Sequence, residues 1–237
     1  MGMSLLAWLG AMSIGVSLGL LGSGGSILTV PVLVYLIGQD EKLAIAGSLA
    51  IVGAIAAAGS LPYLRKKLID WRTVLLFGVP GMAGTYLGAW LATWVSGLVQ
   101  LALFAVVMLI ASWQMLKPVT LDDSPHEPRE VWKIVLDGLL VGILTGLVGV
   151  GGGFLIVPAL VLLGGLTMHR AVATSLVIIA LKSFTGFWKY LDVLDQQGLS
   201  LDWNIIAIVT ALGVVGSLIG SRIAGRVDQR KLRKVFG

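Results

Sequence analysis

Two glycine-rich segments have the residue types and the spacing that could bind a ligand. The first runs through Gly22, Ser23, Gly24 and Gly25, and Ser26 follows it directly. Successive backbone N–H groups in such a turn form a nest for an anion, and a helix that starts at Ser26 adds its unpaired N–H groups and positive dipole end. Because glycine has no side chain, the space stays open. The segment therefore predicts an anion site made of backbone.

The second segment repeats the pattern at Gly149, Val150, Gly151, Gly152 and Gly153, where a helix is expected to restart. In both copies a proline lies five residues into the restarted helix, Pro31 in the first and Pro158 in the second. Proline lacks an N–H and frees a carbonyl one turn back, so kinked or late-starting helices are predicted. The alternative, that these glycines only allow close helix packing, stays open.

Several polar side chains could complete the site. Hydroxyl groups lie nearby in the sequence, and Lys182 stands in the middle of an apolar stretch, where insertion into a membrane costs on the order of 3 kcal/mol. The functional interpretation is a positive counter-charge for an anion. The alternative is a lysine that snorkels or bonds to carbonyls, because the first copy has Ile55 at this place. The predicted substrate-binding residues are Ser23, Gly24, Gly25, Ser26, Ser48, Val150, Gly151, Gly152, Gly153, Thr174, Ser175 and Lys182, with Pro31 and Pro158 as structural helix breaks.

The composition predicts a membrane protein. Of 237 residues, 57% are apolar and 12% charged, whereas soluble domains have about 25% charged residues. This excludes an ordinary soluble domain, a disordered chain and a nucleic-acid binder. The sequence has no cysteine, and it shows no paired-carboxylate, Ser-His-Asp or His-rich pattern, so we expect no enzyme, no metal site and no cofactor. The expected partners are a lipid bilayer and a small anion, and a homo-oligomer stays open.

The apolar stretches predict an all-α polytopic fold. Two of them, Leu5–Ile37 and Val131–Leu163, would make helices of roughly 50 Å, too long for a hydrocarbon core of about 30 Å. We interpret each as a hairpin of two shorter helices that meet at the glycine-rich segment. The other stretches each fit one crossing: Leu43–Leu61, Thr73–Val95, Leu98–Leu116, Ala171–Leu191 and Asn204–Ala224.

The chain contains an internal repeat. Residues 19–34 and 146–161 share ten of sixteen residues at an offset of 127, and after a five-residue insertion Gly81, Gly84 and Gly88 match Gly213, Gly216 and Gly220. We interpret these later glycines, and Gly138, Gly142 and Gly146, as packing positions. The repeat predicts transmembrane units at 1–116 and 131–237 joined by a cytoplasmic linker at 117–130. A counterpart of the last helix of the first unit is expected to begin near Lys231, so either the sequence is truncated, or this helix is absent or supplied by another subunit.

The distribution of basic residues predicts how the units are oriented. If each long stretch is a hairpin, fourteen basic residues share one face and only Lys42 and Lys189 lie on the other, whereas single crossings would divide them eight and eight. The positive-inside rule favours the hairpins. The second unit is then inverted relative to the first, a plan typical of secondary transporters. The N-terminus would lie outside, with the linker and the basic C-terminal segment in the cytoplasm.

The doubled glycine–proline motif resembles the TauE/SafE family of sulfite exporters, within the 4-toluene sulfonate uptake permeases. The similarity includes the helix at Ala171–Leu176 and covers nearly the whole chain. It implies an inner-membrane permease for sulfite, an organosulfonate or a similar anion, with alternating access around a midplane site between the two glycine-rich turns. This chain departs from the family pattern at its C-terminal end and at Ser26. The rival hypotheses are a non-transporting scaffold or assembly factor, and an anion channel.

Overall fold

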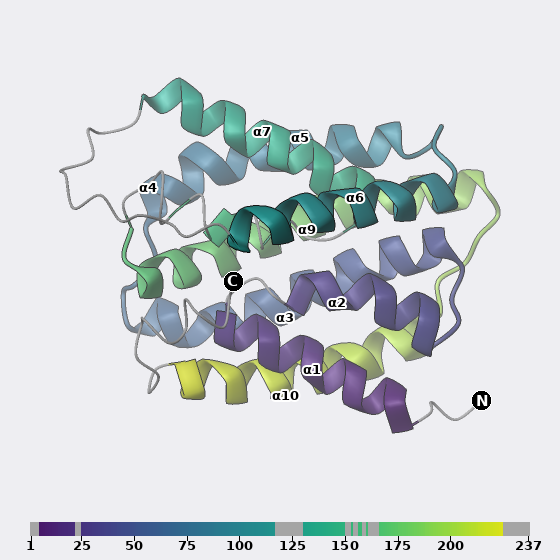
Figure 1. Ribbon diagram of the computed structural model, residues 1–237, viewed down its shortest axis with the longest axis horizontal. Coiled ribbons are helices and arrows are strands. Elements are labelled where there is room, and N and C mark those ends of the chain that lie inside the picture. Colours follow the sequence, from purple (N-terminus) through teal and green to yellow (C-terminus); the bar gives the residue numbers. More distant parts are fainter. Residues whose placement is uncertain are drawn as a thin grey trace.

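The computed structural model describes residues 5–21, 25–116, 130–149, 153, 156–157, 160 and 166–224. Its regular elements are helices, which confirms the all-α prediction for these residues (Figure 1). They are α1 (Leu5–Leu21), α2 (Gly25–Pro31), η1 (Val32–Leu36), α3 (Glu41–Arg65), α4 (Trp71–Thr73), η2 (Val74–Gly78), α5 (Val79–Leu91), α6 (Gly97–Leu116), α7 (Val131–Val148), α9 (Met168–Gln196) and α10 (Trp203–Ala224). Five segments are long and apolar enough to cross a membrane: 41–65, 71–91, 131–148, 168–196 and 203–223.

Helices α3 and α9 form the centre of the molecule and contain more of the described buried residues than any other two helices. They run antiparallel. Gly53 faces Ser183, at 3.2 Å from an ideal Cβ on the glycine to the serine Cβ. On either side of this contact, Leu49 faces Gly186, and Gly59 faces Leu176. The two helices are counterparts in the repeat, so equivalent elements point in opposite directions.

The outer helices pack in two parallel pairs, α1 with α10 and α5 with α7. In Figure 1, α5 and α7 lie along the top, and α1 and α10 along the bottom. Glycines bring the backbones together, because any Cβ there would collide with the facing main chain. The contacts in the first pair are Gly15 with Gly213 and Gly19 with Ser217; those in the second are Gly142 with Gly81 and Gly146 with Thr85. The packing role predicted for Gly81, Gly142, Gly146 and Gly213 is confirmed.

The contacts between α1 and α10 are the repeat counterparts of the contacts between α7 and α5. Gly15 and Gly19 correspond to Gly142 and Gly146 at the offset of 127, and the facing residues correspond in the same order. The first helix of each unit thus packs on the glycine-spaced helix of the other unit, α1 on α10 and α7 on α5. Because α3 and α9 are also antiparallel, we infer an inverted repeat with a pseudo-two-fold axis near Gly53 and Ser183.

The contacts divide the described helices into two groups. Helix α3 packs on α10 and α1, and α9 packs on α5 and α7. We call α1, α3 and α10 the first bundle, and α5, α7 and α9 the second bundle. Each bundle therefore mixes helices from both sequence units, and the main contact between the bundles is α3 with α9.

The first long apolar stretch forms a hairpin, as predicted. Helix α1 ends at Leu21 and α2 begins at Gly25, where the chain turns back along α1. Gly25 faces Ile14 and Leu18, whereas Gly10 faces Val32 and Leu36. Beyond Pro31 the helix continues as the π-helix η1, as expected for a helix that loses an N–H donor.

In the second long stretch, α7 ends at Val148, and Gly149 adopts a left-handed conformation with φ 77°. Glycine tolerates this geometry, which closes the helix. Most of the rest of this stretch lies outside the described residues.

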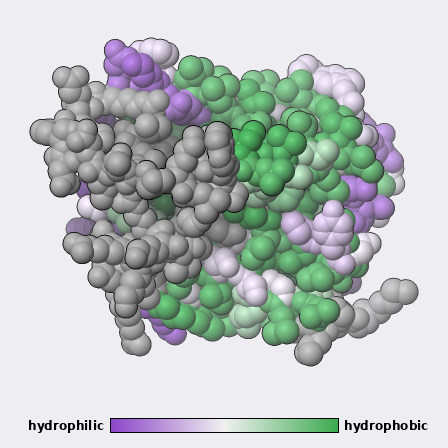
Figure 2. Space-filling model, in the orientation of Figure 1, coloured by the Kyte–Doolittle hydropathy of each residue, from purple (hydrophilic) through white to green (hydrophobic). Residues whose placement is uncertain are grey.

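Charge and hydropathy are distributed as a membrane protein requires. Because α3 and α9 are antiparallel, Arg65 and Arg170 lie at one end of the central pair, whereas Lys42 and Lys189 lie at the other. Figure 2 shows hydrophobic residues over most of the described surface on one face. Large exposed apolar side chains on α5, α6 and α10 contribute to this surface.

Candidate functional site

Lys182 lies in the interior of the second bundle, on α9. Its side chain is 0% exposed, and its Nζ has no hydrogen-bond partner among the described residues. The aliphatic chain runs past Gly81 on α5, where an added Cβ would lie 2.9 Å from Lys182 Cδ. The Nζ lies 5.9 Å from the centroid of the Phe77 ring on η2. Gly81 therefore provides the space that the lysine chain occupies.

The repeat shows that packing alone does not require a charge at this position. Ile55, the counterpart of Lys182, packs against Gly213, which is the counterpart of Gly81. An apolar side chain therefore fills the equivalent space in the first bundle. A buried ammonium without a partner is unfavourable by several kcal/mol, so its presence favours a role in binding a negative charge.

The hydroxyl groups of the predicted site form hydrogen bonds with backbone groups and do not face a common cavity. Ser48 donates hydrogen bonds to Ile45 O on its own helix and to Gly149 O at the end of α7. Ser175 donates to Val172 O at 2.9 Å, and Thr174 accepts from the backbone N–H of Asp70 at 3.0 Å. These contacts link α3 to the end of α7 and α9 to the start of α4.

Ser48 and Ser175 lie at different levels of the central helix pair. Ser48 is next to Leu49, whereas Ser175 is next to Leu176, which faces Gly59. Leu49 and Gly59 are ten positions apart on α3, a rise of about 15 Å. The structure therefore does not bring these two hydroxyls into one site. Lys182 lies between the two levels, because its neighbour Ser183 faces Gly53.

The glycine-rich segments themselves are only partly described. Gly25 packs tightly on α1, Ser26 is fully buried, and Gly153 is buried within a helical stretch. Pro31 ends α2 as a helix break. The remaining predicted residues lie outside the described part of the chain: Ser23, Gly24, Val150, Gly151, Gly152 and Pro158.

Sequence reasoning missed a polar cluster at the end of α7. Gln100 Nε2 on α6 donates to Leu147 O at 2.7 Å and to Tyr190 OH at 2.9 Å, and Tyr190 OH donates to Leu147 O at 3.3 Å. Both side chains are fully buried. The available signal was Gln100, an amide near the start of the apolar stretch 98–116. The cluster satisfies a carbonyl in the last turn of α7 and joins that helix to α6 and α9.

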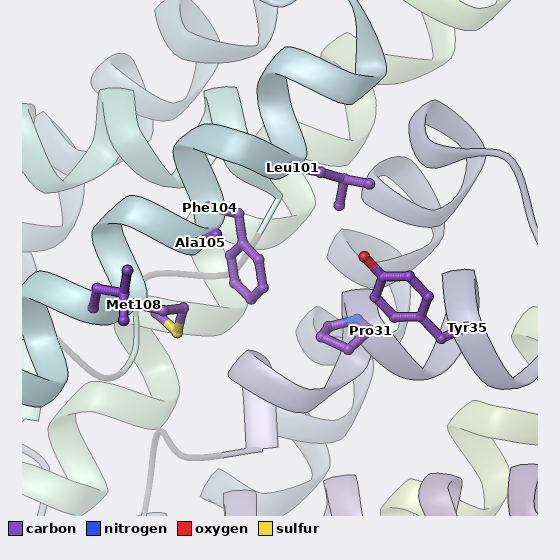
Figure 3. A pocket seen from close by; sticks show the side chains of 7 residues that line it. Pro31, Tyr35, Leu101, Phe104, Ala105 and Met108 are labelled. Atoms are coloured by element: carbon purple, nitrogen blue, oxygen red, sulfur yellow. The ribbon is translucent and has the colours of Figure 1, made fainter.

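Figure 3 shows a cavity of about 500 Å³ between the α2–η1 segment and α6. Its lining is almost entirely apolar and has no cationic group, so it is unsuited to an anion. The residues that line it are Pro31, Tyr35, Leu101, Phe104, Ala105, Met108 and Leu109. Within the described residues, no group of three His, Cys, Asp or Glu side chains could hold a metal ion.

These features define a polytopic helical membrane protein with a buried cation in its core. The family model described as "Sulfite exporter TauE/SafE" matches residues 7–237, and the chain belongs to this family. A "Probable membrane transporter protein" of Xylella fastidiosa is 32% identical over 94% of this chain and 87% of its own length. "Probable membrane transporter protein YunE" of Bacillus subtilis is 31% identical over 70% of each chain.

A more distant relative is "Probable membrane transporter protein MJ0441" of Methanocaldococcus jannaschii, 26% identical over 93% of this chain and 87% of its own length. No solved structure matches the chain. The protein is thus an integral membrane transporter and not an enzyme.

Proposed function

We propose that the protein is a secondary transporter for a small sulfur-containing anion, such as sulfite or an organosulfonate. The observation that supports the anion most directly is the buried Lys182 Nζ without a hydrogen-bond partner. A bound anion would supply the missing charge and the missing hydrogen bonds together. The family description supports sulfur chemistry for that anion.

In this proposal Lys182 is the central contact of the anion, and backbone N–H groups of residues 23–26 and 150–153 are proposed as further contacts. Ser48 lies near the start of α3 and Ser175 near the start of α9, toward opposite ends of the central pair, so these two hydroxyls contribute to different parts of the path. The midplane site between the two glycine-rich turns stays a prediction.

The repeat and the charges support alternating access in a defined orientation. The proposed inverted units, 1–116 and 131–237, give the molecule two related conformations that open to opposite sides. The end that holds Arg65 and Arg170 is assigned to the cytoplasm, because basic residues favour that side. The proposed location is the inner membrane, with the N-terminus outside and the linker 117–130 inside.

Counterflow in proteoliposomes tests the proposal. Vesicles that contain the purified protein and unlabelled methanesulfonate or sulfite should accumulate the labelled anion transiently and saturably from outside. Protein-free vesicles are the control. Flux without saturation or counterflow would indicate a channel, and no flux above the control would favour a non-transporting scaffold.

A further inference from the structure

We infer that the Lys182 site selects anions with a single negative charge over anions with two. The inference rests on the proposed function and concerns the charge of the species that binds. A single ammonium group can balance one negative charge in the interior. The number of charged groups around Lys182 therefore decides how many negative charges a ligand can carry.

Lys182 is the one charged side chain that is fully buried among the residues that the structure describes. Helices α3, α5 and α7 and the π-helix η2 pack against α9. Residues 74–91 of η2 and α5 include no charged residue, and the charged residues of α3 lie at its ends, at Glu41, Lys42 and Arg65. No second cation faces Lys182 from these elements.

Helix α7 has its charged residues near its start. They are Lys133, which pairs with Glu130 at 2.7 Å, and Asp137, which is partly buried and makes no hydrogen bond to Lys182 Nζ. The tyrosines of the packed elements, Tyr63 and Tyr86, cannot carry a positive charge. The local charge available to a ligand is therefore one positive unit.

A monoanion paired with this ammonium leaves the interior neutral. A dianion would leave one negative charge without a partner in an environment of low polarity, which is strongly unfavourable. The neighbouring Phe77 ring suits the uncharged part of the ligand. The charge balance thus favours an alkylsulfonate or hydrogensulfite, and it disfavours sulfate.

Ligand-dependent thermal unfolding of the purified protein tests this inference. We would measure the melting temperature against increasing sodium methanesulfonate and sodium sulfate, at constant ionic strength set with sodium gluconate. A ligand that binds the folded state raises the melting temperature in a saturable way. The apparent affinity for methanesulfonate is expected to exceed that for sulfate by at least about tenfold.

Two variants on the same helix make the result specific. Lys182→Ile should lose the response to methanesulfonate, whereas Lys189→Gln, which removes a partly buried lysine paired with the exposed Asp192, should keep it. Equal responses to both anions that disappear in Lys182→Ile would overturn the charge selectivity and leave the proposed function intact. A methanesulfonate response that persists in Lys182→Ile would overturn the assignment of the site. Failure of counterflow in the wild type would instead remove the proposed function itself.

Discussion

Replacing Lys182 with isoleucine is expected to abolish anion transport while the protein stays at least as stable as the wild type. Transport should fall by at least about 100-fold, because the transported charge loses the one fully buried counter-charge among the described residues. The free energy of unfolding should stay the same or rise by about 1–2 kcal/mol, because an unpaired buried charge is removed. Ile55 against Gly213 shows that isoleucine fits this environment.

For each variant we would measure the initial rate of methanesulfonate counterflow in proteoliposomes and the melting temperature in detergent. Lys189→Gln is the matched control, since it also removes one positive charge from α9, but at an ion pair with the exposed Asp192 near the end of that helix. Its rate should stay within about twofold of the wild type, because an ion pair with a solvent-exposed partner contributes little. Normal transport by Lys182→Ile would contradict the proposed role of the lysine. A large loss of stability would show that Lys182 supports the fold.

A disulfide across the α3–α9 contact is expected to stop transport reversibly. The chain has no cysteine, so introduced pairs are the only thiols. Gly53→Cys with Ser183→Cys places the two Cβ atoms about as far apart as in a disulfide, at 3.2 Å in the present structure. Contacts within the outer pairs are backbone against backbone, whereas α3 and α9 meet through side chains. We therefore expect the two bundles to move at this contact.

Oxidation of this double variant should reduce counterflow by more than about tenfold, and a reducing agent should restore it. The repeat provides two matched controls within the bundles, Gly59→Cys with Ser217→Cys and Thr85→Cys with Gly186→Cys. In these pairs, the ideal glycine Cβ lies 2.5 Å from Ser217 Oγ and 2.7 Å from Thr85 Cγ2, respectively. Cross-linked controls should keep most of their transport. Full transport by the oxidised Gly53/Ser183 pair would refute motion at the α3–α9 contact.

Much of the architecture could be predicted from local patterns. The length of Leu5–Ile37 exceeded one crossing, and the glycine cluster within it marked the place where α1 ends and α2 begins. The glycines around Gly142 and Gly213 were recognised as packing positions because small residues at helical spacing let helices approach closely. The repeat also identified Ile55 as the counterpart of Lys182, which the contacts with Gly213 and Gly81 bear out.

The partners of these helices could not be predicted from one sequence. The repeat did not indicate that α1 would pack on α10 and α7 on α5, because pairing between helices depends on the complete set of surfaces. For the same reason the levels of Ser48 and Ser175 on the central helices were unknown, and a site that contains both was predicted. Phe77 and Gln100 were overlooked, since an apolar residue and an amide in an apolar stretch become informative only when their neighbours are known.

A structure of the protein with bound 2-bromoethanesulfonate is the most direct test of the central claim, that an anion pairs with Lys182. The bromine atom would locate the ligand independently of its sulfonate group. We predict a sulfonate oxygen at about 3 Å from Lys182 Nζ, with the organic part toward Phe77. A ligand that lies between residues 23–26 and 150–153, with the lysine still unpartnered, would contradict the account.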